Sequence, residues 1–357
     1  MKYLNTIITG SGSYIPKNIV TNDDFTKHDF YSVQKKKLDA SGNEIINKFY
    51  EITGIKERRY LNTQHKVSDI GYMAAQQAID NAGIDPETID QIIVAHNFGD
   101  IIKGTIQTDI LPSLASRIKQ SLKIKNPSCV AYDIIFGCPG WLQGVIQADA
   151  FIKAGVGKRF LVIGTEALSR VVDPYDRDSM IYADGAGATI IEGVEEDKPR
   201  GVLSSSMRTD TLEEAYYLYM GESNNPDDNT DTKYIKMDGR KIYEHALNNV
   251  PSAMKQALDK ADIDLSSVKK VLIHQANEKM DEAIIKRLFR LYKSPVKKDV
   301  MPMSIRLFGN SSVATIPTLY DLILKGDYEN HEINEDDIIM FASVGAGMNI
   351  NAIVYKQ

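Results

Sequence analysis

Two stretches of this chain, separated by about half its length, share one pattern of residues. Residues 75–97 (AQQAIDNAGIDPETIDQIIVAHN) match residues 254–277 (MKQALDKADIDLSSVKKVLIHQAN) when Ala78 is aligned with Ala257. In both copies a helical pattern is followed by an apolar run that is typical of a buried strand. Self-similarity at this separation indicates that one structural unit occurs twice in the chain.

The repeat continues beyond these two stretches. Two further pairs align in the same order: residues 136–138 (Phe-Gly-Cys) with 308–310 (Phe-Gly-Asn), and residues 161–164 with 339–342. We therefore predict two equivalent halves, residues 1–195 and 196–357, with a boundary between residues 185 and 205. The corresponding positions differ in chemistry, so a cavity between the halves would combine side chains that neither half holds alone.

Apolar runs that favour strands alternate with amphipathic patterns that favour helices. The expected buried strands are 92–95, 160–163, 271–273 and 338–342, and the expected helices are 69–83 and 251–261. Residues 6–10 predict a first strand that ends in a glycine turn, and the polar residues 221–233 predict a surface loop. Residues 32–47 are similarly polar. The alternation is typical of an α/β protein with largely parallel sheets.

The composition narrows the class of protein. The chain has 357 residues, of which 43% are hydrophobic, and a formal net charge of -6, which argues against a general nucleic-acid binder. No stretch approaches the roughly 20 apolar residues of a membrane-spanning helix, and the N-terminus lacks a signal-peptide pattern. The two cysteines form no disulfide framework. We therefore predict a cytoplasmic protein whose partners include neither nucleic acid nor membrane.

Cys138 is the stronger of the two candidate nucleophiles. It stands in the sequence FGCPG (136–140), ahead of a helical pattern at 141–154. Because proline favours the first position of a helix, we expect Cys138 at the N-cap, where the helix dipole would lower the pKa of its thiol. The resulting thiolate would attack a thioester carbonyl. The alternative is a small buried cysteine in a tight turn, which is our interpretation of Cys129.

His274 and Asn310 are candidates from the second half. His274 follows a strand and replaces Ala95 of the first copy, and strand ends are where α/β folds place catalysis; the alternative is a structural histidine. Asn310 corresponds to Cys138 in the repeat, and the alternative is a turn asparagine. The glycine turn around Ala346 is either an oxyanion-binding turn or a simple loop. The histidines and cysteines show no metal-ligand spacing, so we predict no metal site.

Taken together, these segments resemble the ketoacyl-(acyl carrier protein) synthase III family of the thiolase-like superfamily, over the whole chain. The matching segments are GSGSYIP (10–16), TGIKERR (53–59), DPYDR (173–177), ADGAGA (183–188), IHQAN (273–277) and GNSSVATIP (309–317). The order cysteine, histidine, asparagine in these contexts is specific, and it favours catalytic roles for Cys138, His274 and Asn310 over the structural alternatives.

The resemblance implies both a fold and a reaction. The fold would be the α/β thiolase fold, with two pseudo-equivalent halves in αβαβα layers, usually as a homodimer. Cys138 would take an acyl group from acyl-CoA or acyl carrier protein, and a malonyl- or β-ketoacyl-type thioester would then be condensed with it. His274 and Asn310 would stabilise the enolate that forms on loss of carbon dioxide. The backbone N–H groups of Cys138 and Ala346 would form the oxyanion hole, and no cofactor would be needed.

Several positions depart from the members that initiate fatty-acid synthesis. The tryptophan and arginine with which those members hold the coenzyme A head group are replaced here by Lys48 and Ile52. Trp141 and Met348 are expected to alter the acyl pocket, in favour of a longer or branched chain. Fatty-acid initiation and a specialised condensation, of polyketide or dialkylresorcinol type, both stay open. The alternatives from other classes are a non-condensing acyltransferase or thioesterase and an idle subunit that only binds acyl thioesters.

The resemblance also implies an acidic carrier protein as a partner. The helix expected after His274 carries Lys279, Lys286 and Arg287, which match positions near the carrier-docking surface of the family. A basic face of this kind would steer an acidic partner towards the cavity of an acidic enzyme. The alternative is an ordinary solvated helix face.

Overall fold

A nine-stranded sheet forms the centre of the molecule. The computed structural model describes residues 2–102, 104–328 and 330–357. Within these ranges, the strands of the sheet are in spatial order β13 (Val268–Ile273), β14 (Ile338–Gly345), β15 (Asn349–Lys356), β10 (Gly201–Thr209), β1 (Tyr3–Tyr14), β9 (Asp184–Glu196), β8 (Arg159–Ala167), β4 (Gln91–Ala95) and β7 (Val130–Ile134). The four buried strands expected from the sequence are β4, β8, β13 and β14, and all four are confirmed.

Two groups of neighbouring strands in the sheet repeat one pattern of strand pairing. β1 pairs antiparallel with β9, β9 pairs antiparallel with β8, and β8 pairs parallel with β4. β10, β15, β14 and β13 make the same pairings in the same order. The two sets join where Thr6 of β1 lies beside Gly201 of β10. This pattern supports a duplicated unit, and we propose that the halves divide at the connection 197–200, next to the boundary expected after residue 195.

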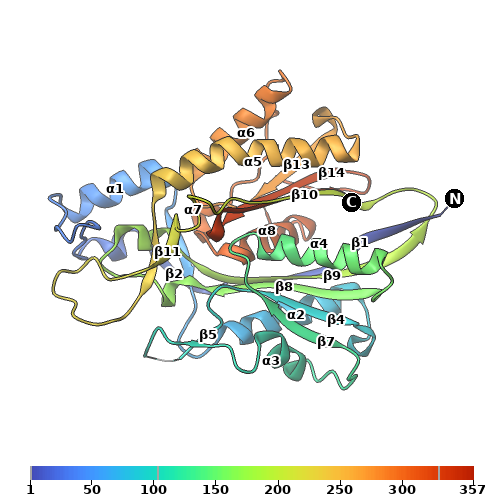
Figure 1. The fold of residues 1–357 in the computed structure, drawn as a ribbon, viewed down its shortest axis with the longest axis horizontal. Helices are drawn as coiled ribbons and strands as arrows, with labels where there is room; N and C mark the ends of the chain where they lie inside the picture. The colour runs from blue at the N-terminus through green and yellow to red at the C-terminus, as the bar shows by residue number, and fades with distance from the viewer. Residues whose placement is uncertain (1, 103, 329) are drawn as a thin grey trace.

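Helices lie between these two groups of strands and also cover the outer face of each group, as Figure 1 shows. One outer layer holds α5 (Gly239–Ala261) and α6 (Glu278–Leu291), the central layer holds α4 (Gly140–Lys153) and α8 (Thr315–Leu324), and the other outer layer holds α2 (Val67–Ala82) and α3 (Leu114–Ser121). Buried apolar side chains fill the space between each helix layer and the sheet. The expected αβαβα layering is therefore confirmed.

β1 does not end in the glycine turn expected at residue 10 but continues to Tyr14. Gly10 and Gly12 lie inside the strand because α2 crosses directly over them. A Cβ on Gly10 would lie 2.4 Å from the carbonyl oxygen of Ala78, and a Cβ on Gly12 would lie 2.3 Å from that of Ala74. The two glycines therefore permit a close approach of helix and strand, and do not mark a turn.

α5 begins at Gly239, well before the start expected at Pro251. Pro251 is a buried residue inside the helix, so the prediction that it begins the helix is wrong. The actual N-cap is Asp238, whose side chain accepts a hydrogen bond from the backbone N–H of Lys241. The apolar face of the long helix supplies enough burial to keep proline in its interior.

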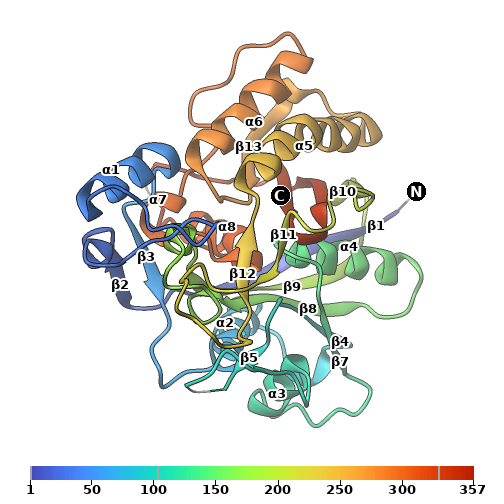
Figure 2. The same cartoon turned by 60° about the vertical axis from the view of Figure 1, so that its left-hand side comes forward.

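Shorter elements gather at one end of the layers, as Figure 2 shows for α1, α7 and β12. They are α1 (Gly42–Thr53), α7 (Ile305–Phe308), and the strand pairs β2 (Asn18–Thr21) with β3 (Glu57–Tyr60), β5 (Asp100–Ile101) with β6 (Thr108–Asp109), and β11 (Leu218–Gly221) with β12 (Tyr234–Met237). The loop expected at 221–233 joins β11 to β12, whereas the polar stretch 32–47 contains the start of α1. Across the described ranges, no helix is both long and apolar enough to cross a membrane.

Candidate active site

A cavity of about 830 Å³ is lined by residues from both halves of the chain. Cys138 comes from the first half, and His274, Asn310 and Ala346 come from the second. The structure thus brings together the side chains that differ between equivalent positions of the repeat. The volume of the cavity lies in the range that is typical of small-molecule binding sites. In the part of the chain that the structure describes, no group of three or more His, Cys, Asp or Glu is placed to hold a metal ion.

The turn between β7 and α4 presents Cys138 to the cavity. Gly137 has a φ of 65°, a backbone conformation that glycine adopts without strain. The carbonyl of Pro139 accepts the first hydrogen bond of α4, from the N–H of Gln143, and Pro139 is therefore the N-cap. Cys138 precedes the N-cap by one residue, which corrects the position expected from the sequence.

The Cys138 thiol is neutral in the resting site, contrary to the thiolate expected from the sequence. The side chain is half-buried at the cavity wall, and the surrounding protein raises its pKa to about 11 by removing water from the sulfur. A hydrogen bond from Ser312 Oγ, 3.4 Å from Sγ, lowers that pKa, and the nearby Glu166 carboxyl raises it. Desolvation is therefore the largest influence on this thiol, and its pKa is raised where the sequence predicted a lowered one.

His274 enters the cavity from the end of β13. Its backbone N–H donates to the carbonyl of Ala342, and the buried Gln275 beside it donates to the carbonyl of Pro302 at 2.7 Å. Burial lowers the pKa of His274 to about 4, and a backbone hydrogen bond with Ser312 raises it in part. The ring is therefore neutral near pH 7, and its N–H group is available to donate a hydrogen bond without a positive charge.

Asn310 is held in one orientation by backbone groups. Its N–H donates to the carbonyl of Ile181, and its own carbonyl accepts from the N–H of Ala183. The side-chain Oδ1 accepts a hydrogen bond from the N–H of Ser312 at 2.8 Å. Because Oδ1 is engaged in this bond, Nδ2 is the end of the amide that is left to donate into the cavity.

The turn that carries Ala346 lies against the turn that carries Cys138. A Cβ on Gly345 would lie 2.4 Å from the backbone nitrogen of Cys138, and a Cβ on Gly137 would lie 2.7 Å from that of Ala346. Side chains at these two positions would push the turns apart. The backbone N–H groups of Cys138 and Ala346 therefore share one small region of the cavity wall, as an oxyanion hole requires.

Three polar residues near the cavity are not identified by the sequence analysis. Glu166 of β8 is fully buried and accepts hydrogen bonds from both nitrogens of Asn97. Ser312, the first residue of the 3₁₀ turn η6 (Ser312–Ala314), contacts both Asn97 and Cys138. Glu166 could have been found from the sequence, because it stands at the end of an apolar run that predicts a buried strand. Glutamate is rarely buried without a partner, so its presence there indicates a special role. Asn97 and Ser312 carry no such signal.

Of the two residues expected in the acyl pocket, Met348 lines the cavity and Trp141 does not. Trp141 is buried in the central layer, where its ring meets that of Phe341 edge-on at a centroid distance of 5.8 Å. The prediction for Trp141 is wrong because its side chain packs against the sheet, away from the cavity. Apolar side chains of α1 and of the β11–β12 pair line the cavity instead: Ile45, Phe49, Ile52, Leu218, Met220, Ile235 and Met237.

The three basic residues of α6 that were predicted to dock a carrier protein differ in whether they are bonded to other residues of the chain. Lys279 is exposed. Lys286 forms an ion pair with Glu282 at 3.1 Å, one turn away on the same helix. Arg287 donates to Asn248 of α5 at 2.7 Å, and so joins the two helices of the outer layer. Lys279 is therefore the candidate best placed to meet an acidic partner.

The fold and the cavity together define a class, the thiolase-fold acyltransferases. The chain superposes on the 3-oxoacyl-[acyl-carrier-protein] synthase III of Aquifex aeolicus VF5 with a TM-score of 0.79 and 29% identity, over 99% of this chain and 100% of the other. The priming β-ketosynthase of the R1128 polyketide pathway gives a TM-score of 0.79 at 24% identity, over 99% and 97% of the two chains, and shows the same fold.

Sequence comparison places the chain within that class. Residues 132–211 match the 3-oxoacyl-[acyl-carrier-protein (ACP)] synthase III family, and residues 258–357 match the C-terminal region of that family. The β-ketoacyl-[acyl-carrier-protein] synthase III of Prochlorococcus marinus subsp. pastoris is 33% identical over 97% of this chain and 95% of its own length. The chain belongs to the 3-oxoacyl-(acyl carrier protein) synthase III family. It is thus a condensing acyltransferase, and the non-condensing alternatives are not favoured.

Proposed function

We propose that this chain forms a carbon–carbon bond between an acyl group held on Cys138 and a malonyl-type thioester. In the first step, Cys138 Sγ attacks the carbonyl carbon of the donor thioester. The backbone N–H groups of Cys138 and Ala346 donate to the oxygen that becomes negative. The new C–S bond to Cys138 replaces the donor's C–S bond, and the thiol proton leaves with the departing thiol.

The second step creates and uses a carbanion. The malonyl thioester loses carbon dioxide, and the electron pair of the broken bond becomes an enolate. Asn310 Nδ2 and the neutral ring of His274 donate hydrogen bonds to the enolate oxygen. The α-carbon then attacks the acyl carbonyl, and the C–S bond to Cys138 breaks with its electron pair returning to the sulfur. A β-ketoacyl thioester is released, and the Cys138 sulfur regains a proton from solvent. The observation that carries this proposal is that Cys138, His274 and Asn310 line a single cavity.

The chemistry of the cavity bears on the substrates. The names of this chain's relatives include acyl carrier protein, and we propose that acyl carrier protein is also a partner of this chain. Acyl-CoA is the second proposed acyl donor. The apolar lining contributed by α1 and by the β11–β12 pair favours a donor chain longer than acetyl, in fatty-acid or specialised synthesis. The proposed steps need thioester substrates and no cofactor. We further propose that two copies of this chain form a homodimer in the cytoplasm.

Intact-mass spectrometry tests the acyl acceptor. The protein and its Cys138→Ala variant are incubated with acyl-CoAs from acetyl to dodecanoyl and with the same acyl groups on carrier protein. We expect an acyl adduct on the unmodified protein only, and the chain with the highest yield identifies the donor. An adduct of equal yield on the Cys138→Ala variant, or no adduct from either kind of donor, would contradict the proposed role of Cys138.

A further inference from the structure

A chain of hydrogen bonds connects a buried carboxyl to the Cys138 sulfur. Glu166 Oε2 accepts from the backbone N–H of Asn97 at 2.8 Å and from Asn97 Nδ2 at 2.7 Å. Asn97 Nδ2 also donates to Ser312 Oγ at 3.1 Å, and Ser312 Oγ donates to Cys138 Sγ at 3.4 Å. Glu166 and Ser312 are 0% and 2% exposed. The chain of contacts thus joins β8 to the cavity through the interior of the protein.

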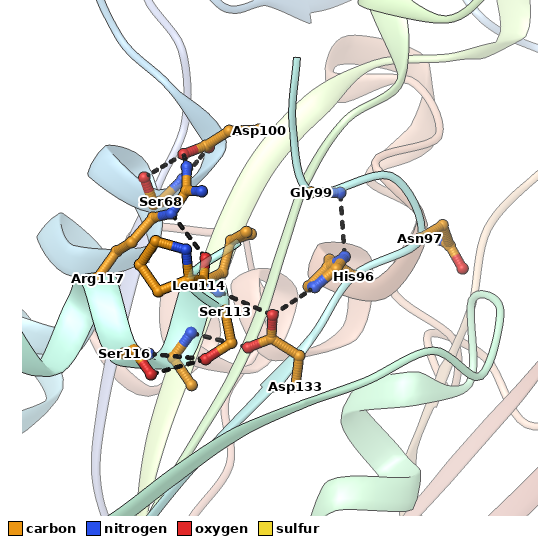
Figure 3. Close-up of polar contacts among 12 residues, drawn as sticks. Ser68, His96, Asn97, Gly99, Asp100, Ser113, Leu114, Ser116, Arg117 and Asp133 are labelled. Atoms are coloured by element: carbon orange, nitrogen blue, oxygen red, sulfur yellow. Dashed lines mark hydrogen bonds and ion pairs between the residues drawn. The ribbon is translucent and has the colours of Figure 1, made fainter. Parts of the chain in front are cut away.

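The neighbours of Asn97 hold it in place. His96 is buried, its Nδ1 accepts from the N–H of Gly99, and its Nε2 lies 2.9 Å from Asp133 (Figure 3). Because Nδ1 is an acceptor, the ring proton lies on Nε2 and points to Asp133. Asp133 is itself fixed by two backbone N–H groups at the start of α3. In Figure 3 the side chain of Asn97 points away from this cluster. Its Nδ2 donates to Glu166 Oε2.

Ser312 is the point at which the chain of hydrogen bonds meets the cavity. Its φ of 54° lies in the left-handed region, which a serine adopts only where its surroundings hold it. Its N–H fixes the Asn310 amide. Its hydroxyl carries a single proton, and because a lone pair accepts from Asn97 Nδ2, that proton is directed at the sulfur of Cys138.

We propose that Glu166, Asn97 and Ser312 are positioning residues that orient the Cys138 sulfur and govern the ease with which it loses its proton. The inference rests on the proposed role of Cys138 as the acyl acceptor. Ser312 and Glu166 act in opposite directions. The hydrogen bond from Ser312 stabilises the thiolate, and the charge of an ionised Glu166 opposes it.

The ionisation of Glu166 falls in an accessible pH range. Burial raises its pKa to about 7; the hydrogen bonds from Asn97 lower it in part, and Asp184 of β9 raises it further. Its second oxygen, Oε1, is buried and has no hydrogen-bond partner among the described residues. Glu166 is therefore neutral below pH 6 and charged above pH 8, so its effect on Cys138 appears between these two values.

The experiment is the rate of alkylation of Cys138 by iodoacetamide from pH 5.5 to 9.5, followed by peptide mass spectrometry, which separates Cys138 from Cys129. It needs no acyl substrate, so its result is independent of the condensation reaction. For Glu166→Gln we expect the wild-type rate below pH 6 and a rate several-fold higher than wild type above pH 8. For Ser312→Ala we expect alkylation roughly tenfold slower at every pH, since a hydrogen bond to the thiolate is lost.

Two further variants complete the test. Ser311→Ala is the matched control, because Ser311 Oγ pairs with Thr315 and not with Cys138, and it should leave the rates unchanged. Asn97→Ala should slow alkylation in the same direction as Ser312→Ala, and it replaces that variant if Ser312→Ala does not fold. Two results would overturn the proposal: a Glu166→Gln to wild-type rate ratio that does not change with pH, or wild-type rates in both Ser312→Ala and Asn97→Ala.

Discussion

At the scale of single residues, glycines with nearly the same φ angle precede two side chains of different chemistry. Gly137 and Gly309 have φ angles of 65° and 67°, and each is followed by a side chain that faces the cavity, Cys138 in one half and Asn310 in the other. In the proposed reaction the first side chain is the nucleophile, and the second is an amide whose donor end is set by Ser312. A duplicated turn thus presents two different groups to one substrate.

The two steps of the proposed reaction are separable at Asn310. We expect Asn310→Ala to reduce condensation about a hundredfold or more, because a donor to the enolate oxygen is lost. Acylation of Cys138 uses the backbone N–H groups and should stay within roughly threefold of wild type. Pre-steady-state measurement of acyl-enzyme formation, alongside steady-state product formation, gives both rates. Equal losses in the two steps would remove Asn310 from its assigned role.

The buried carboxyl of Glu166 predicts a pH dependence of stability. Its pKa rises from 4.5 to about 7 on folding, so its stabilising contribution is complete below pH 4.5 and is lost as pH rises through 7. Glu166→Gln removes this loss. We expect the Tm difference, variant minus wild type, to increase by a few degrees between pH 5 and pH 8. Calorimetry at both values checks this, and a difference that is independent of pH contradicts it.

Single-residue environments were the least predictable part of the site. The contexts of Cys138, His274 and Asn310 correctly indicated a shared cavity, because the repeat and the motifs act over long stretches of sequence. The neutral state of the Cys138 thiol and the core position of Trp141 depend on what surrounds each side chain. The Glu166–Asn97–Ser312 chain joins residues from distant segments, so no local pattern indicates it.

At the scale of elements, the site depends on contact between two turns. The turn from β7 to α4 carries Cys138, and the turn from β14 to β15 carries Ala346. Each turn has a glycine where the other approaches. The contact places two backbone donors together, so the distance between the turns would set the geometry of the proposed oxyanion hole.

Gly345→Ala tests this contact. The added Cβ would lie 2.4 Å from the Cys138 nitrogen, so the turns must separate, and we expect acylation of Cys138 to fall about a hundredfold. Gly326→Ala is the control for stability alone: Gly326 has a φ of 73° with open space around it, and the change costs about 1 kcal/mol. Acyl-enzyme formation should be normal in Gly326→Ala. Normal acylation in Gly345→Ala would show that the contact is dispensable.

The elements themselves were largely predictable, because their periodicity reflects burial. β4, β8, β13 and β14 each contain a buried apolar run and fall where the sequence places them. The errors lie at Gly10 and Pro251, where residues that usually interrupt an element lie inside one. In both places tertiary packing decides: α2 needs the glycine, and the buried face of α5 tolerates the proline.

At the scale of the whole molecule, α6 and α3 lie on opposite outer faces (Figure 1). We expect Lys279→Glu on α6 to raise the KM for a carrier-bound substrate roughly tenfold at low ionic strength, because the carrier is acidic. The KM for the corresponding CoA thioester should not change. Lys125→Glu, on an exposed residue beyond α3, is the matched control and should affect neither substrate. An equal change for both substrates with Lys279→Glu would contradict docking at α6.

If the two halves of one chain build a single condensing site, carbon dioxide release and product formation are coupled, and one reaction in which both are followed tests this. The protein is acylated with its preferred donor and then mixed with malonyl carrier protein. We predict one carbon dioxide released per β-ketoacyl thioester formed, and no β-ketoacyl thioester from Cys138→Ala after mixing. Transfer or hydrolysis of the acyl group without carbon dioxide and without a β-ketoacyl product would show that the cavity is not a condensing site.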